Sequence, residues 1–206
     1  MVPENSMTTG YSDSINHALA YAAKHHDRQV RKGTRLPYLT RPANVAIILT
    51  RYGCDEATIV GGILHDVIED CVRDGFTRDM LDQRIGEKFG ANVLEAMLGV
   101  TYRRIDDDGI EMSLDDKKAD YLSRLSSATE EALWVSAADK IHRVNSLLSD
   151  LRRTQDANSV WSRFIGGRAS TVTWYAQVLD RLDEIGFKAP IVDELRTAVT
   201  ALEEQP

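Results

Sequence analysis

Apolar residues recur every three to four positions along most of this chain, a spacing that gathers them on one face of an α-helix. No stretch alternates strictly between apolar and polar residues, and no Asn-Gly hairpin turn is present. We therefore predict an all-α fold. The expected helices cover residues 13–28, 42–53, 56–70, 77–89, 91–100, a segment opening at 113, 129–151, 159–185 and 191–203.

Local signals mark where several of these helices begin and where the pattern breaks. Gly33, Pro37 and Pro42 interrupt the apolar periodicity within ten residues, which predicts a loop after the first helix. Pro42 suits the first turn of the second helix, where its missing N–H has no intrahelical partner to lose. Asp55 and Ser113 are typical N-caps of the helices that follow them.

Composition narrows the class of protein. The 206 residues carry 25 basic and 32 acidic side chains, a net charge of −7, which argues against binding nucleic acid or anionic lipid through bulk charge. No apolar run approaches the roughly 18 residues of a membrane span, and no signal-peptide order opens the chain. Two cysteines without CxxC spacing fit a reducing cytoplasm. We expect a flexible N-terminus over 1–12 and a single helical domain over 13–206.

The third predicted helix ends in an unusual polar sequence, His65-Asp66-Val67-Ile68-Glu69-Asp70. Helical spacing places His65 beside Glu69, and Asp66 beside Glu69 and Asp70. This could be a solvated helix end, but acidic groups there oppose the helix dipole. An imidazole next to a carboxylate supplies nitrogen and oxygen ligands for a divalent transition metal. Glu69 and Asp70 would then remain for proton transfer.

Asp139 is a second candidate, because it follows the apolar run WVSAA inside the helix predicted over 129–151. A buried aspartate costs desolvation energy unless it is paired or binds a cation. An ion pair with Arg143, four residues on, would be enough. The more specific interpretation is that Asp139 completes a site with the His-Asp pair.

The segment between the first two helices concentrates positive charge in an acidic protein. Its basic residues are His26, Arg28, Arg31, Lys32, Arg35 and Arg41. Simple solvated charge is one interpretation. Guanidinium groups match phosphate, however, and an aromatic ring stacks on a base. Arg31, Lys32 and Tyr38 together therefore indicate a nucleotide pocket.

In this order, the motifs resemble those of the HD-domain hydrolases of the RelA/SpoT family, in particular the stand-alone small alarmone hydrolases. The matching motifs are H-x-x-Q-V-R-K at 26–32, P-Y-x-x-x-P at 37–42, LHDVIED at 64–70, FG at 89–90, V-T at 100–101 and A-D-K-I-H at 138–142. The likeness spans about residues 15–150. It implies an all-helical HD fold and removal of the 3′-diphosphate from guanosine tetra- or pentaphosphate, usually with Mn²⁺.

The resemblance also implies roles for individual residues. The implied metal ligands are His65, Asp66 and Asp139, the catalytic pair is Glu69 and Asp70, and the substrate pocket contains Arg31, Lys32, Tyr38, Arg143 and Ser146. The implied partner is a small nucleotide, with no nucleic acid and no membrane. Adenine-based alarmones and a nicotinamide dinucleotide phosphate are the alternative substrates.

This sequence departs from the family at two positions. Arg41 stands where the family has a metal-ligating histidine, and a guanidinium has no lone pair to offer a metal. Arg41 could instead neutralise Asp66 and Asp139 as a fixed cation. Arg143 stands where the family usually has asparagine, which adds a second positive charge. Three hypotheses follow: a hydrolase with weakened metal binding, a substitution made to trap substrate, or an HD domain that binds a nucleotide as a sensor.

The C-terminal quarter carries aromatic residues at near-helical spacing: Trp161, Phe164, Trp174 and Tyr175. Such spacing is typical of a core or of an interface between subunits. A homo-oligomer is therefore one of the states we consider. Arg163 and Arg168 lie in the same region and could reach a pyrophosphate group.

Overall fold

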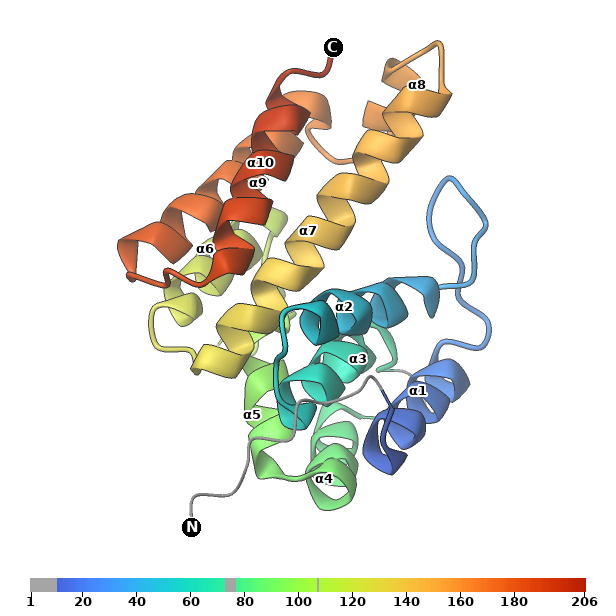
Figure 1. The fold of residues 1–206 in the computed structure, drawn as a ribbon, viewed down its shortest axis with the longest axis vertical. Coiled ribbons are helices and arrows are strands. Elements are labelled where there is room, and N and C mark those ends of the chain that lie inside the picture. Colours follow the sequence, from blue (N-terminus) through green and yellow to red (C-terminus); the bar gives the residue numbers. More distant parts are fainter. Residues whose placement is uncertain (1–10, 73–76, 107) are drawn as a thin grey trace.

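The computed structural model describes residues 11–72, 77–106 and 108–206 (Figure 1). Over these ranges the chain forms ten α-helices and no strand, and its extended pairings are two isolated bridges. The helices are α1 (Asp13–His25), α2 (Thr40–Arg51), α3 (Glu56–Asp70), α4 (Arg78–Phe89), α5 (Ala91–Val100), α6 (Leu114–Leu125), α7 (Glu130–Arg153), α8 (Asn158–Trp161), α9 (Gly167–Glu184) and α10 (Pro190–Glu203). The all-α prediction is confirmed.

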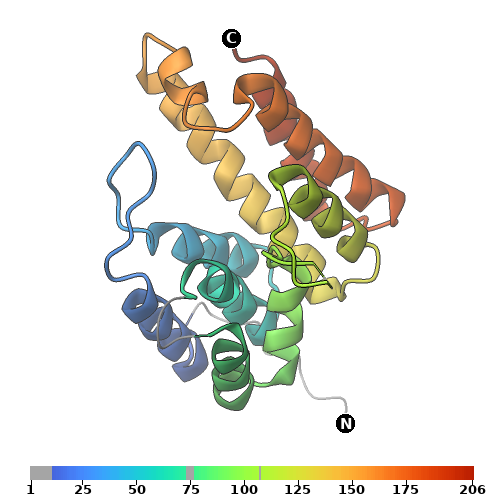
Figure 2. The ribbon, with the colours of Figure 1, turned by 180° about the vertical axis from the view of Figure 1, so that it is seen from behind.

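Two helices organise the packing. Helix α3 is strongly apolar along its middle, where every residue from Thr58 to Ile68 is buried. It packs against α1, α2, α5 and α7. Helix α7 crosses the molecule, contacting α2, α3 and α5 on one side and α9 and α10 on the other (Figures 1 and 2). The middle of α7 therefore lies against the apolar core that surrounds α3.

Most of the predicted helix starts are fixed by capping side chains. Asp55 accepts a hydrogen bond from the Thr58 amide at 2.8 Å, and Ser113 accepts one from the Asp116 amide at 3.1 Å. Each bond satisfies an amide that has no partner within its helix. The N-caps predicted at Asp55 and Ser113 are thus confirmed.

Helices α2 and α3 meet closely at a glycine. A Cβ atom added to Gly62 would lie 2.5 Å from Leu49 Cδ1, whereas one added to the neighbouring Gly61 would lie 3.4 Å from the Ala96 Cβ. The lack of a side chain at position 62 lets α2 approach α3. This approach carries the N-terminal turn of α2 towards the polar end of α3.

The structure corrects three element boundaries. The first helix ends at His25 instead of residue 28, and α2 begins two residues before Pro42. The single helix expected over 159–185 is wrong: α8 ends at Trp161 and α9 starts at Gly167. The break falls at Gly166 and Gly167, whose φ angles of 79° and 61° are incompatible with a continuous right-handed helix.

Two other expectations concern the chain ends and a membrane. The predicted flexible N-terminus falls, over residues 1–10, outside the described residues, and the single domain over 13–206 stays a prediction. Among the helices described, none combines the length and apolarity needed to cross a bilayer.

Candidate active site

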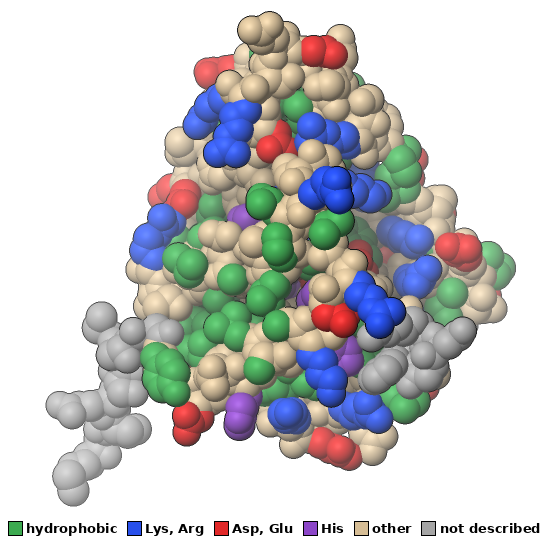
Figure 3. Space-filling model, turned by 90° about the vertical axis from the view of Figure 1, so that its right-hand side faces the viewer, with side chains coloured by type: hydrophobic (Ala, Val, Ile, Leu, Met, Phe, Trp, Pro, Cys, Tyr) green, Lys and Arg blue, Asp and Glu red, His purple; other side chains and the backbone are tan. Residues whose placement is uncertain are grey.

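Three helices bring the predicted metal ligands to one buried point. Helix α3 supplies His65 and Asp66, the middle of α7 supplies Asp139, and the first turn of α2 supplies Arg41. Their exposed fractions are 4%, 1%, 3% and 7% in that order. We call these four residues, together with Lys140, the buried charge cluster. Figure 3 shows the right-hand side of the molecule as drawn in Figure 1, where lysine and arginine side chains are interspersed with acidic and histidine side chains.

The guanidinium of Arg41 lies between the three predicted ligands. Its Nη1 is 2.9 Å from Asp66 Oδ2, and its Nη2 is 2.9 Å from Asp139 Oδ1. Its Nε also donates to Asp139 Oδ1 at 3.0 Å, and Nη2 lies 3.3 Å from His65 Nε2. Arg41 therefore joins the two carboxylates and the imidazole through direct contacts.

His65 is held in a fixed orientation by its own helix. Its Nδ1 donates to the carbonyl oxygen of Gly62 at 2.7 Å, so its Nε2 faces the cluster. This Nε2 lies 3.2 Å from Asp66 Oδ1 and 3.5 Å from Asp139 Oδ1. Burial lowers the pKa of His65, but the two carboxylates raise it more, and the resulting pKa lies above the ordinary value.

Asp139 has two further cationic partners on its own helix. Lys140 Nζ donates to Asp139 Oδ2 at 2.9 Å, and Arg143 Nε donates to Oδ1 at 3.3 Å. Lys140 is buried, with its Nζ 4.6 Å from the centroid of the Tyr121 ring. Sequence reasoning anticipated the Arg143 contact and missed Lys140, although a lysine within the apolar run around Asp139 was the available signal.

Among the direct contacts of Asp66 and Asp139, positive charges outnumber negative charges. Burial raises the pKa values of Asp66 and Asp139, but the nearby cations, Arg41 first among them, lower both pKa values below the ordinary range. Both carboxylates are therefore ionised at neutral pH. Two negative charges face three positive ones, on Arg41, Lys140 and Arg143.

The arrangement does not fit a resident divalent metal. His65, Asp66 and Asp139 are donors of the right chemistry, but the guanidinium that lies between them has no lone pair to share. Across the described residues, no group of three or more His, Cys, Asp or Glu side chains is placed to hold a metal ion. The cation already present among these side chains is Arg41.

Glu69 and Asp70 lie at the outer edge of the cluster, at the end of α3. Asp70 is exposed, and its Oδ2 accepts from the Tyr38 hydroxyl at 2.5 Å. Glu69 is partly buried, and its Oε2 accepts from the Tyr102 amide at 3.4 Å. Burial, followed by the negative charges of Asp66 and Asp70, raises the pKa of Glu69. A carboxyl group with a raised pKa is suited to exchange a proton near neutral pH.

Tyr38 connects the loop to both parts of the site. Its hydroxyl oxygen accepts from Arg41 Nη1 at 2.6 Å, and it lies 3.1 Å from Asp66 Oδ2. One face of its ring stacks on His26, with the ring centroids 4.6 Å apart. Tyr38 thus lies in the site as predicted, but a base could stack only on the remaining face of its ring.

The predicted phosphate-binding side chains lie along α7 and the facing loop. Arg31 Nη2 donates to Ser146 Oγ at 2.5 Å, one turn beyond Arg143. Burial, followed by the charge of Arg31, lowers the pKa of His142, the residue before Arg143, to about 4, so this imidazole is neutral. Lys32 is exposed, and no described residue makes a hydrogen bond or ion pair with it. The structure therefore brings Arg31, Arg143 and Ser146 together and leaves Lys32 apart.

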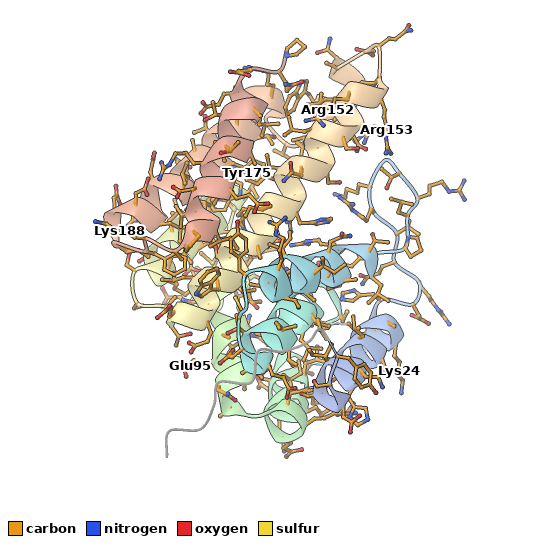
Figure 4. All side chains as sticks on the ribbon, in the orientation of Figure 1. Lys24, Glu95, Arg152, Arg153, Tyr175 and Lys188 are labelled. Atoms are coloured by element: carbon orange, nitrogen blue, oxygen red, sulfur yellow. The ribbon has the colours of Figure 1, made fainter. Side chains whose placement is uncertain are left out.

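The C-terminal residues considered for pyrophosphate binding have structural partners. Arg163 Nη1 forms an ion pair with Asp150 at 2.9 Å, and Arg168 donates to the carbonyl oxygens of Glu203 and Gln205. Three of the four aromatic side chains are buried in the core: Trp161, Trp174 and Tyr175, the last of which lies on α9 in Figure 4. These residues stabilise the packing of α8, α9 and α10.

Sequence comparison gives a family model and several relatives. A model described as HD domain matches residues 18–171. A GTP pyrophosphokinase from Myxococcus xanthus is 33% identical over 138 residues, covering 66% of this chain and 17% of the relative. A guanosine-3′,5′-bis(diphosphate) 3′-pyrophosphohydrolase from Aquifex aeolicus is 36% identical over 91 residues, covering 44% of this chain and 12% of the relative. The chain thus spans less than a fifth of the length of these curated relatives.

Two solved structures share the fold. One is described as a metazoan ortholog of SpoT that hydrolyzes ppGpp; it matches with a TM-score of 0.69 and 23% identity over 92% of this chain and 96% of the other. A structure from Listeria monocytogenes EGD-e matches with a TM-score of 0.63 and 27% identity over 78% of this chain and 96% of the other. The helical arrangement described above is therefore common to all three.

Proposed function

This chain belongs to the HD domain family, as its motifs predicted, and from that premise we propose that it acts on guanosine 3′,5′-bis(diphosphate), removing the 3′-diphosphate. One observation carries the proposal: the His65-Asp66 pair and Asp139 meet between two groups of side chains. We call Glu69 and Asp70 the acidic edge, and Arg31, Arg143 and Ser146 the arginine-rich edge. The curated relative named as the corresponding pyrophosphohydrolase supports the same reaction. The products are GDP and pyrophosphate, or GTP and pyrophosphate where the substrate is the pentaphosphate.

The arginine-rich edge supports recognition of the diphosphate. Arg31 and Arg143 have guanidinium groups suited to phosphate oxygens, and Ser146 offers a hydroxyl beside them. About a third of the Arg143 side chain is exposed, so it can meet a ligand from solvent while contacting Asp139. These three residues would hold the diphosphate against the acidic edge.

The acidic edge supports the proton transfers of the reaction. The oxygen of a water molecule attacks the phosphorus bonded to the 3′ oxygen, and the P–O3′ bond breaks. The 3′ oxygen leaves with the bonding electrons and takes up the proton that the water loses, and pyrophosphate carries the water oxygen. Glu69, with its raised pKa, is the group we assign to taking the proton from water. Asp70 lies beside it and would orient the water together with the Tyr38 hydroxyl.

HD-domain hydrolases depend on a metal, and Mn²⁺ is the ion we propose for a hydrolytic form of this site. His65, Asp66 and Asp139 are the side chains with donor atoms for it, but with Arg41 between them they do not fit the ion. Hydrolysis by the present chain is therefore expected to be slow. Replacing Arg41 by histidine, whose lone pair can bind a metal, is expected to raise the rate of hydrolysis.

The position of Arg41 favours a second candidate function. A domain that recognises the same nucleotide but has a guanidinium among its predicted ligands would bind it without hydrolysis and act as a sensor. The recognition residues Arg31, Arg143 and Ser146 would serve either function unchanged.

Incubation with ppGpp and Mn²⁺, followed by quantification of pyrophosphate and by calorimetric binding, separates the two functions. Pyrophosphate release that Glu69→Gln abolishes supports the hydrolase. Tight binding without release supports the sensor. A panel at equal concentration, with an adenine alarmone and NADPH beside ppGpp, tests the substrate. Preference for a compound without a 3′-diphosphate would contradict the proposal.

A further inference from the structure

We propose that Arg41 is a permanent cation at the centre of this site, so that the domain folds and takes its phosphorylated ligand without a divalent metal. The half of the proposal that concerns the ligand rests on the proposed function. The half that concerns the metal does not, because it follows from contacts among protein side chains alone.

The first support is that every nitrogen of the guanidinium has an acceptor. Nε donates to Asp139, Nη1 faces Asp66 and the Tyr38 hydroxyl, and Nη2 faces Asp139 and His65. The five contacts measure between 2.6 and 3.3 Å. A planar guanidinium whose N–H donors all face acceptor groups is held in one position. An arginine resting by chance on two carboxylates would leave several donors to solvent.

The second support is burial. Only 7% of Arg41 is exposed, and the Asp66 and Asp139 side chains are 1% and 4% exposed. Moving Arg41 away would leave two buried carboxylates without their shared cation, which is far costlier than losing a solvent-exposed ion pair. An incoming ion would have to displace this arrangement before it could gain a single ligand.

The third support is the balance of charge. Lys140 and Arg143 also contact Asp139, so the two carboxylates already face three cations. Asp66 and Asp139 are therefore already neutralised, and a divalent ion placed between them would bring positive charge that these two carboxylates no longer balance. Arg41 and Arg143 together carry the same charge as one divalent ion, and they deliver it through covalently attached groups.

Metal content and thermal stability of the natural chain test this directly. Purified protein equilibrated with Mn²⁺ and then dialysed is expected to hold far less than one ion per chain. Its melting temperature is expected to be the same in Mn²⁺ as in EDTA. Stoichiometric metal, or a melting temperature that Mn²⁺ raises and EDTA reverses, would overturn the proposal by showing that Arg41 gives way to the ion.

Two variants complete the test. Arg41→His is expected to gain stoichiometric Mn²⁺, and saturating metal should raise its melting temperature by about 5–10 °C. Arg51→His is the matched control, because Arg51 lies on the same helix in an exposed pair with Glu194. It should gain no metal. Equal metal uptake by the two variants would overturn the assignment, and the measurements on the natural chain stand even if Arg41→His fails to fold.

Calorimetric titration with ppGpp tests the ligand half. The dissociation constant is expected to be the same in EDTA and in Mn²⁺. Binding that requires Mn²⁺ would overturn metal independence. Absence of binding under both conditions, with an unchanged melting temperature in EDTA, would remove the proposed nucleotide and leave the structural role of Arg41 intact.

Discussion

At the scale of single residues, Asp139 shows how a buried carboxylate can be stabilised by several cations. Its Oδ1 accepts from Arg41 and Arg143, and its Oδ2 accepts from Lys140. Burial of a charge costs several kcal/mol unless partners restore what water gave it. The contribution of each partner therefore depends on burial more than on distance.

Lys140→Met tests this dependence. The variant removes the partner of Asp139 Oδ2 in a fully buried environment, and we expect it to lower the free energy of unfolding by about 3 kcal/mol. Arg196→Met is the control, because Arg196 and Asp183 form an exposed pair at 2.8 Å that should contribute less than about 1 kcal/mol. Urea unfolding measures both. Equal losses would contradict the role of burial.

Glu69→Gln separates chemistry from folding at the acidic edge. The raised pKa of Glu69 means that its ionised form destabilises the fold, so this carboxyl group reduces stability as the pH rises from the ordinary value of 4.5. The glutamine variant should melt higher than the natural chain at neutral pH, and the difference should vanish below pH 4.5. Melting curves across this range test the sign.

Turnover gives the complementary measurement. Glu69→Gln should abolish pyrophosphate release, because an amide keeps the shape but does not exchange the proton. Asp70→Asn should lower turnover with little change in stability, since Asp70 is exposed. Where the natural chain is inactive, both variants are measured in the Arg41→His background. Undiminished turnover in both would remove the pair from the mechanism.

At the scale of elements, the contact between α2 and α3 sets where Arg41 can reach. Gly62 allows the two helices to approach, and Leu49 and Val45 of α2 fill the space above it. Both of these side chains are fully buried, so they have little room to move. A side chain at position 62 would therefore push α2 outward and weaken the contact between Arg41 and His65.

Paired alanine substitutions test this contact. Gly62→Ala should destabilise the protein by about 1–3 kcal/mol, because its Cβ would lie 2.5 Å from Leu49 Cδ1. Gly61→Ala places its Cβ at an ordinary contact distance of 3.4 Å and should stabilise by about 0.5–1 kcal/mol through helix propensity. Opposite signs in denaturant unfolding are expected. Destabilisation of similar size in both would mean that the close approach is not special to position 62.

The sequence predicted those features of the helices that depend on residues close together in the chain. The caps at Asp55 and Ser113 each accept from an amide three residues further along the chain, so the local sequence was enough to predict them. The break before α9 needs Gly166 and Gly167 in left-handed conformations, and that choice depends on how α8 packs. The His-Asp pair was likewise visible as adjacent residues. The five contacts of the Arg41 guanidinium form only because α2, α3 and α7 meet. The spacing of residues along the chain does not predict this meeting.

At the scale of the whole molecule, charge is unevenly distributed. The net charge is −7, yet Arg31, Arg41 and Arg143 all lie at the candidate site. A highly charged anion such as ppGpp is repelled by the molecule as a whole and attracted by these arginines. Its binding should therefore depend on local attraction, which salt screens.

The salt dependence of binding tests this distribution. Raising NaCl from about 0.01 to 1 M shortens the screening length roughly tenfold and should weaken ppGpp binding. Arg31→Gln should weaken binding at low salt and flatten its dependence on salt, since Arg31 lies at the arginine-rich edge. Lys188→Gln serves as the control, because Lys188 lies on the opposite side of the molecule from the loop between α1 and α2 that carries Arg31 (Figure 4). A salt dependence that is flattened in the Lys188 variant alone would contradict the assignment of the binding site.

The contact between Arg41 and Asp139 joins residues 98 positions apart in the chain, and this separation has a consequence for rates. Closing so long a loop costs entropy before any contact compensates for it, so we expect this pair to form after the folding transition state. Contacts made that late leave the folding rate unchanged and slow unfolding. In stopped-flow measurements, Arg41→Met should therefore unfold faster and refold at the natural rate. The guanidinium would thus determine how long the folded state lasts once it has formed.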